Sequence, residues 1–328
     1  MSVIAPREFA RLREVRAAQP ELVSAALESR RRRPVLRGDR RLFFVAADHP
    51  ARGSLSVGQD KTAMADRYGL LERLAVALSH PGVDGVLGTP DIIDDLAVLG
   101  LLNDKIVVGS MNRGGLQGSC FEMDDRGTAY EVPTMVERGI DFAKALVRID
   151  LDDPATVRTL AAIAGAVTAA AAARMPIMLE PFISRRQRGR VVNDLTPDAV
   201  IRSISIASAL GSDSAFTWLK IPVVKEMDRV MASTTLPALL LGGDSDGDPD
   251  ERFAAWEAAL ALPGVRGLTV GRTLLFPPDG DVWGAVDVAA RMVHPASAAG
   301  SGAASAADSP AADTPAEHVG EHTLKERA

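Results

Sequence analysis

The chain has 328 residues, of which 47% are hydrophobic and 24% charged, a composition typical of a globular protein with a large core. Its 37 basic and 43 acidic side chains give a formal net charge of −6, which argues against a general role in binding polyanions. The chain has a single cysteine, Cys120, which excludes a disulfide framework and a thiolate metal cluster. It has only five histidines, which argues against a histidine-rich metal site. We therefore expect no metal and no cofactor.

Two helical patterns, residues 6–18 and 20–33, form an N-terminal extension over residues 1–41. The second pattern ends in a cluster of basic residues, which we interpret as a solvated helix end and not as a nucleic-acid site. The cluster consists of Arg30 to Arg33, Arg37, Arg40 and Arg41.

Eight short apolar runs follow, and each is succeeded by a Gly/Pro/Asp-rich loop and a helical pattern. The runs begin at Leu42, Val83, Lys105, Asp141, Pro176, Phe216, Pro237 and Arg266. The helical patterns cover residues 64–78, 90–101, 134–139, 154–174, 197–210, 225–233, 250–260 and 282–293. Continuous apolar strands alternating with helices indicate a parallel sheet covered on both faces. Eight such units over residues 42–295 predict a (β/α)8 TIM barrel, an α/β fold. The competing doubly wound sheet would normally carry GxGxxG after its first strand, and that motif is missing.

The final residues, 296–328, consist mainly of Ala, Ser, Gly, Pro, Asp and Glu and predict a disordered tail. No apolar signal core precedes the first helix, and the longest uncharged apolar run, residues 159–173, is too short to span a bilayer. We therefore expect a cytoplasmic protein that contacts no membrane.

Lys220 interrupts the apolar strand FTWLKIPVV in a chain that has six lysines against 31 arginines. An ammonium among Trp218, Leu219 and Ile221 would be desolvated, which lowers a lysine pKa toward neutrality. A Schiff-base lysine needs this property, because only the free amine attacks a carbonyl. The alternative is a structural lysine paired with a carboxylate, and strand position alone leaves the two open.

Lys144 repeats this pattern in DFAKALVRID and shares its strand face with Leu146, Arg148 and Asp150. A second cation at the barrel mouth would depress the pKa of Lys220 and could hold an anionic group. A strand-end ion pair is the alternative.

Two carboxylates end strands that should open at the same mouth, Asp48 in VAADHP and Glu180 in IMLEPF. Carboxylates beside a lysine can relay protons during carbinolamine formation and carbon–carbon cleavage. Either residue alone could equally cap a turn, but four strands place Asp48, Lys144, Glu180 and Lys220 together. His49 could assist, although a histidine beside proline in a loop is more often structural.

Glycines and an arginine after the last two strands indicate a phosphate site, since barrels often bind phosphate with the backbone there. The residues are Gly242, Gly243, Gly271 and Arg272. The basic loop 185–190 (RRQRGR) either grips a second anionic end of a substrate or is solvated. The acidic loop 244–251 lacks calcium-loop spacing, and the glycines after Arg113 match no dinucleotide fingerprint, so we set both aside.

These strand ends resemble a known enzyme superfamily. FTWLKIPVV with TTLPALLLGG resembles class I tagatose-bisphosphate aldolase, and AADHP resembles the first-strand motif of archaeal-type class I fructose-bisphosphate aldolases and of the wider deoxyribose-phosphate aldolase superfamily. The resemblance covers residues 42–276, with few identities outside the strand ends. It implies that Lys220 is the Schiff-base lysine and that Asp48, Lys144 and Glu180 are active-site residues. It also implies that Gly243, Gly271 and Arg272 bind phosphate.

The chain is also similar to barrel proteins associated with inositol catabolism, which implies 6-phospho-5-dehydro-2-deoxygluconate as an aldol substrate. Arg148 stands where relatives place an aromatic residue, and it would suit an acidic substrate or indicate another reaction. We thus expect a cytoplasmic class I aldolase, a lyase of carbohydrate metabolism that binds a phosphorylated small molecule, contacts no nucleic acid and forms a homo-oligomer. The alternatives are a deoxyribose-phosphate-type or transaldolase-like enzyme, a non-catalytic sugar-phosphate binder, and a metal-dependent lyase using Asp48, Glu180 and Asp244.

Overall fold

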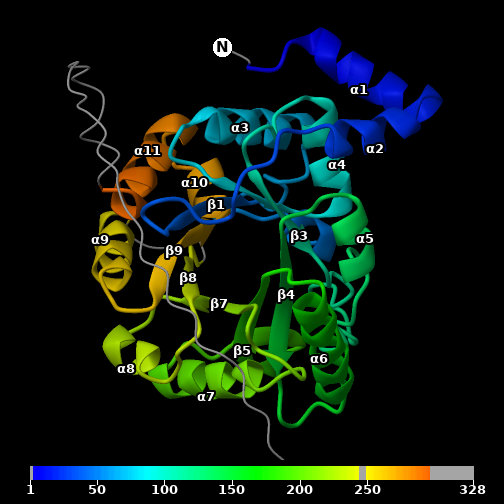
Figure 1. The fold of residues 1–328 in the computed structure, drawn as a ribbon. Helices are drawn as coiled ribbons and strands as arrows, with labels where there is room; N and C mark the ends of the chain where they lie inside the picture. Colours follow the sequence, from blue (N-terminus) through cyan, green and yellow to red (C-terminus); the bar gives the residue numbers. More distant parts are fainter. Residues whose placement is uncertain (1–2, 244–248, 296–328) are drawn as a thin grey trace, which may run out of the picture.

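Eight parallel strands close into a barrel in the computed structural model, which describes residues 3–243 and 249–295 (Figure 1). Around the barrel they pair in the order β1, β2, β3, β4, β5, β7, β8 and β9, and β9 pairs with β1. The strands are β1 (Leu42–Ala46), β2 (Gly85–Gly88), β3 (Ile106–Ser110), β4 (Phe142–Ile149), β5 (Ile177–Gln187), β7 (Thr217–Pro222), β8 (Ala238–Leu241) and β9 (Val265–Val270). The predicted TIM barrel is confirmed.

Helices follow the strands and surround the barrel in Figure 1, after two that precede it, α1 (Pro6–Ala18) and α2 (Glu21–Glu28). The others are the short helix η1 (Pro50–Arg52), α3 (Arg67–Ser79), α4 (Pro90–Val98), α5 (Val132–Glu137), α6 (Ala155–Ala172), α7 (Pro197–Ser208), α8 (Met227–Met231), α9 (Pro249–Leu260), α10 (Arg272–Leu275) and α11 (Val282–Val293). The predicted tail and most of the acidic loop 244–251 lie outside the described residues.

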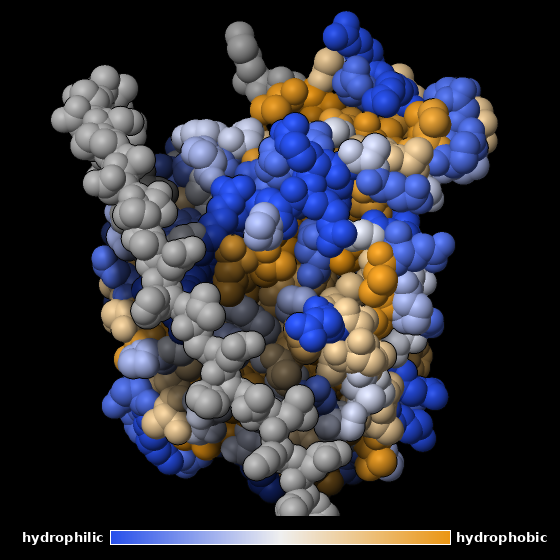
Figure 2. Space-filling view, viewed as in Figure 1, coloured by the Kyte–Doolittle hydropathy of each residue, from blue (hydrophilic) through white to orange (hydrophobic). Residues whose placement is uncertain are grey.

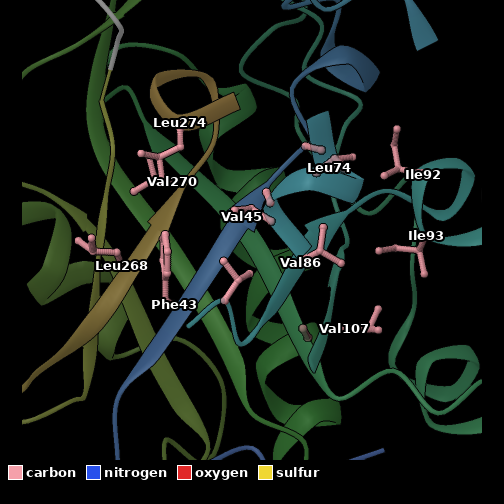
Figure 3. Packing of buried hydrophobic residues seen from close by; sticks show 14 of the residues in the cluster. Phe43, Val45, Leu74, Val86, Ile92, Ile93, Val107, Leu268, Val270 and Leu274 are labelled. Carbon is pink, nitrogen blue, oxygen red and sulfur yellow. The ribbon is translucent and has the colours of Figure 1, made fainter. Parts of the chain in front are cut away.

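The side chains of β1 alternate between two cores, because successive strand residues point to opposite faces. Phe43 and Val45 point outward and pack with neighbouring strands and with helices α3, α4 and α10 (Figure 3). Leu42, Phe44 and Ala46 point inward, where apolar residues of the other strands fill the barrel. Those residues are Leu87, Ile106, Val108, Phe142, Met178 and Leu239. The part of the interior that these residues fill is therefore a packed apolar core and not a channel.

The basic stretch 185–190 is a β-hairpin and not a plain loop. β5 continues past the barrel to Gln187 and pairs antiparallel with β6 (Arg190–Asn193). Arg188 and Gly189 form the turn, and both have positive φ, as the tight turn of a two-residue hairpin requires. Because of this extra strand, the sixth strand of the barrel, which contains Lys220, is β7.

The interpretation of the basic cluster after α2 as a solvated helix end was wrong for Arg30 and Arg33, whereas Arg31, Arg32, Arg37 and Arg40 are exposed. The helix stops at Glu28, and the following segment crosses the barrel end that faces the viewer in Figure 1, where Figure 2 shows hydrophilic residues gathered. Arg30 forms a buried ion pair with Asp141 at 2.6 Å and Arg33 pairs with Asp84 at 2.5 Å. Asp84 directly precedes β2 and Asp141 directly precedes β4. These ion pairs therefore hold the segment after α2 against the barrel.

His294, just after α11, joins the same end of the barrel. Its Nε2 lies 3.0 Å from Asp84 and its Nδ1 contacts Asp39. Burial opposes the charged form, but the hydrogen bonds to Asp84 and Asp39 raise the pKa of His294 above its ordinary value. The C-terminal helix is thereby tied to the N-terminal segment.

Within the described residues, α6 is the one helix long and apolar enough to cross a membrane by length and composition. It packs on the outside of the barrel against β4 and buries Thr159, Ile163, Val167 and Ala170. A core helix of a barrel passes the same test, so this helix is weak evidence for a membrane span.

The Arg30–Asp141 pair yields a stability prediction. Replacing Arg30 with Ala leaves the Asp141 carboxylate largely buried with the exposed Arg32 as its remaining cation, and should lower the free energy of unfolding by about 3 kcal/mol. Urea denaturation at pH 7 measures the change. The control Arg31→Ala removes an exposed pair with Asp104 and should leave the unfolding midpoint nearly unchanged. Equal losses of stability in both variants would contradict the stabilising role of the buried Arg30–Asp141 ion pair.

His294 yields a prediction about pH. A histidine whose pKa is raised by folding stabilises the protein fully below its unfolded pKa of about 6.5, and that stability is lost as pH rises through the folded value. His294→Gln should therefore cost more stability at pH 6 than at pH 9, as measured by thermal unfolding in matched buffers. A loss that grows with pH would show that His294 is held uncharged.

Candidate active site

Four charged side chains meet inside the barrel because each lies two residues beyond an inward-facing apolar residue of its strand. Asp48 follows Ala46 on β1, Lys144 follows Phe142 on β4, Glu180 follows Met178 on β5 and Lys220 follows Trp218 on β7. Side chains two apart share a strand face, so the charges form the layer above the apolar core. We call Asp48, Lys144, Glu180 and Lys220 the quartet.

The quartet is linked by direct contacts. Lys220 Nζ donates to Glu180 Oε1 at 2.7 Å, and Lys144 Nζ lies 2.5 Å from Glu180 Oε2. Lys144 Nζ also donates to Asp48 Oδ2 at 3.3 Å. The glutamate therefore holds one lysine on each oxygen and stands between the two ammonium groups. The ion pairs that stood as the alternatives to a chemical role for Lys220 and Lys144 therefore both exist, and Glu180 is common to them.

Burial and charge control protonation in the quartet. Burial lowers the pKa of Lys144 to about 8, although Asp48 and Glu180 favour its charged form. Burial would raise the pKa of Glu180, but Lys144 and Lys220 hold it well below the usual range. Near neutral pH both carboxylates are thus proton acceptors, while Lys144 can release a proton.

Asp48 has neighbours besides Lys144. Ser110 Oγ donates to Asp48 Oδ2 at 3.1 Å, and Arg113 Nη2 lies 3.1 Å from the same oxygen. His49 Nδ1 is 3.8 Å from Oδ1, and burial lowers the pKa of His49 to about 3, so its imidazole is uncharged near pH 7. Burial opposes the charge on Asp48, but Arg113 and Lys144 keep the pKa of its carboxyl well below the usual range.

Arg148 lies apart from this cluster of contacts. Its Nη1 donates to Glu122 at 2.6 Å, and its Nη2 donates to the main-chain oxygens of Glu122 at 2.7 Å and Gly115 at 3.2 Å. These bonds hold the segment after β3, residues 112–128, over the end of β4. The substrate contact expected for Arg148 stays a prediction.

Arg113 is a site residue that sequence reasoning missed, because the glycines after it matched no dinucleotide fingerprint and were set aside. Gly115 explains their presence: a Cβ there would lie 2.4 Å from the main-chain oxygen of Glu122 and 2.7 Å from Arg148 Nη2. Arg52 also donates to the Gly115 oxygen, at 2.7 Å. An arginine followed by two glycines was the available signal for a tightly packed, charged turn.

The expected phosphate residues lie at the ends of β8 and β9. Gly242 and Gly243 follow β8, and Gly243 has a φ of +70°, which favours glycine. Gly271 precedes α10, and a Cβ there would lie 2.5 Å from the main-chain oxygen of Ala46 and 3.0 Å from His49. Arg272 begins α10, and its charge acts on His49. Gly271 and Arg272 thus lie near His49 at the end of the first strand, and phosphate binding by the four residues stays a prediction.

No group of three or more His, Cys, Asp or Glu side chains within residues 3–243 and 249–295 is arranged to hold a metal ion. Asp48 and Glu180, the carboxylates considered for a metal, have Lys144 between them, and Asp244 lies outside the described residues.

The quartet predicts unequal effects of removing its two lysines. Lys144→Met leaves two buried carboxylates short of a partner and should lower the free energy of unfolding by about 3–5 kcal/mol. Lys220→Met should cost clearly less, because Glu180 keeps Lys144. Urea denaturation at pH 7 compares them, and a larger loss in Lys220→Met would contradict the shared role of Lys144.

Comparison with known proteins gives a family and a fold. Residues 40–290 match the Cgl0159-like family. The crystal structure of Cgl0159 from Corynebacterium glutamicum is 65% identical over 90% of this chain and 99% of that chain, with a TM-score of 0.88. No curated protein matches the chain.

More distant structures are aldolases with the same fold. A Schiff-base-forming fructose-1,6-bisphosphate aldolase is 19% identical over 83% of this chain and 99% of that chain, with a TM-score of 0.56. An archaeal fructose-1,6-bisphosphate aldolase, with its catalytic lysine bound to the carbinolamine intermediate, is 18% identical over the same shares, with a TM-score of 0.59. At these identities the likeness shows the fold alone. The chain belongs to the Cgl0159-like family.

Proposed function

We propose that the protein is a class I aldolase, a carbon–carbon lyase that works through a Schiff base on Lys220. The observation that carries the proposal is the contact of the buried Lys220 Nζ with Glu180, whose other oxygen holds a second lysine. A lysine used only to balance Glu180 would be redundant beside Lys144. The fold shared with Schiff-base aldolases supports the same assignment.

The first step is attack of the Lys220 amine on a substrate ketone. Glu180 accepts the proton that Lys220 gives up, because its carboxylate is already hydrogen-bonded to that nitrogen. The resulting carbinolamine loses its hydroxyl as water, for which Lys144 supplies a proton through the carboxylates that it contacts. The product is a protonated iminium on Lys220.

The second step breaks the carbon–carbon bond. A carboxylate of the quartet, Asp48 or Glu180, removes the proton from the hydroxyl on the carbon that departs. The electrons of the breaking bond move into the iminium to give an enamine, and an aldehyde leaves. Protonation of the enamine and hydrolysis of the new iminium then return the Lys220 amine. The proton transfers use the carboxylates and Lys144 of the quartet, and the sequence of steps contains no change of oxidation state that needs a redox partner.

The substrate class is a phosphorylated ketose or deoxy-keto sugar acid, with the phosphate bound by Gly242, Gly243, Gly271 and Arg272 beside the first strand. Within this class, 6-phospho-5-dehydro-2-deoxygluconate is the candidate that the likeness to barrel proteins of inositol catabolism suggests. Its cleavage would give dihydroxyacetone phosphate and malonate semialdehyde, and either carbonyl can be offered to the enzyme separately.

Borohydride trapping tests the proposal. Incubation with dihydroxyacetone phosphate and borohydride should add one reduced ligand per chain, and peptide mass spectrometry should find it on Lys220. The same trapping with malonate semialdehyde shows which half of the substrate forms the iminium. Phosphate-ligand binding without an adduct on any lysine would replace the aldolase with a non-catalytic sugar-phosphate binder.

Lysine variants separate the nucleophile from its neighbour. Lys220→Arg keeps a positive charge near Glu180 but should abolish the adduct, because a guanidinium does not form the imine. Lys144→Arg should keep the adduct and slow its formation by about tenfold or more, since the shared proton source is lost. An adduct that survives in Lys220→Arg and disappears in Lys144→Arg would assign the Schiff base to Lys144.

A further inference from the structure

Arg113 lies three residues after the end of β3. Its side chain contacts both the main-chain oxygen and the carboxylate of Asp48. Nη1 donates to the main-chain oxygen of Asp48 at 3.2 Å, and Nη2 lies 3.1 Å from its carboxylate Oδ2. Nε donates to the main-chain oxygen of Asn112 at 2.7 Å, which fixes the plane of the guanidinium. The Arg113 side chain is 8% exposed, so water does little to weaken this ion pair.

The charge on Asp48 depends on few partners. Ser110 and His49 adjoin the carboxylate, but the hydroxyl is neutral and the imidazole is uncharged near pH 7. Lys220, farther away on β7, acts on Asp48 through its charge alone. In the part of the chain that the structure describes, Arg113 and Lys144 are therefore the cations in contact with Asp48.

Charges alternate along the whole cluster, from Arg113 through Asp48, Lys144 and Glu180 to Lys220. Lys144 lies closer to Glu180, at 2.5 Å, than to Asp48, at 3.3 Å. Because Arg113 already balances Asp48, Lys144 is available to Glu180. Without Arg113, Asp48 would draw Lys144 toward itself, and Glu180 would hold the proton of Lys220 more strongly.

We propose that Arg113 is a positioning residue, which holds the Asp48 carboxylate and supplies its charge partner so that Lys144 stays on Glu180 and Lys220 can act as an amine. The proposal rests on the proposed Schiff-base function of Lys220. Arg113 acts on that lysine through three intervening side chains, and it belongs to none of the catalytic steps described above.

Arg52 provides a matched control in the same structure. It is as buried as Arg113 and binds the same segment, through the Gly115 oxygen and a contact with Asp125. Its partners do not include Asp48. Arg52→Gln should loosen segment 112–128 while leaving the charge partners of Asp48 in place.

The rate of adduct formation on Lys220 with dihydroxyacetone phosphate and borohydride tests the positioning role. Arg113→Gln should slow the reaction by about tenfold, whereas Arg52→Gln should stay within about threefold of the unaltered protein. Arg113→Lys restores the charge without the planar fork and should recover part of the rate. In an Asp48→Asn background, Arg113→Gln should change the rate by less than about twofold, because the residue through which it acts is gone.

Thermal unfolding gives a readout that needs no activity. Asp48→Asn leaves Arg113 and Lys144 buried without the shared carboxylate, which is destabilising. Adding Arg113→Gln removes one of these cations and should raise the Tm above that of Asp48→Asn alone. Adding Arg52→Gln to Asp48→Asn should instead lower the Tm further, because it breaks a separate pair.

The outcomes separate the two proposals. If the unaltered protein forms no adduct, the proposed function fails, while the direction of the Tm change still decides whether Arg113 is the charge partner of Asp48. An unchanged rate in Arg113→Gln, or a further tenfold loss in the Asp48→Asn background, would overturn the positioning role. If Arg113→Gln does not fold, Arg113→Lys replaces it, and a full wild-type rate in a folded Arg113→Asn variant would equally overturn the proposal.

Discussion

Five charged side chains can be buried at one end of this barrel because they alternate in sign. Each carboxylate lies between two cations, and Lys144 lies between two carboxylates. Removing either carboxylate would leave the cation at that end of the row without its partner, which costs several times more than losing a surface pair. The strand ends bring four of these side chains together, and the turn after β3 brings Arg113 to Asp48. The close packing of Gly115 belongs to the same turn.

An apolar layer inside the barrel packs next to this row of charges. Phe142, Met178 and Trp218 fill the interior two residues before Lys144, Glu180 and Lys220, and the inward face continues from apolar to charged without a break. The opposite end of the barrel is tied by a second set of ion pairs, in which Arg30 and Arg33 hold aspartates that precede strands. Charge therefore orders both ends of the barrel.

Much of this could be predicted from the sequence, for identifiable reasons. Helices at residues 6–18 and 282–293 were predicted with the observed bounds, and the meeting of Asp48, Lys144, Glu180 and Lys220 followed from their positions at the ends of predicted barrel strands. Arg30 and Arg33 were misjudged because their partners lie 111 and 51 residues away, beyond any local pattern. Arg113 was missed for a related reason: its contact with Asp48 depends on how the turn after β3 folds over β1, which no spacing rule describes.

Every part of the mechanism depends on which nitrogen forms the bond to substrate. The most direct measurement is a crystal structure of the protein after reduction with borohydride in the presence of dihydroxyacetone phosphate. We expect continuous electron density from Lys220 Nζ to the former carbonyl carbon, with Glu180 within hydrogen-bonding distance of that nitrogen and Lys144 still between the two carboxylates. Density joined to Lys144, or an unmodified Lys220 in crystals that hold the ligand, would contradict the Schiff-base role of Lys220.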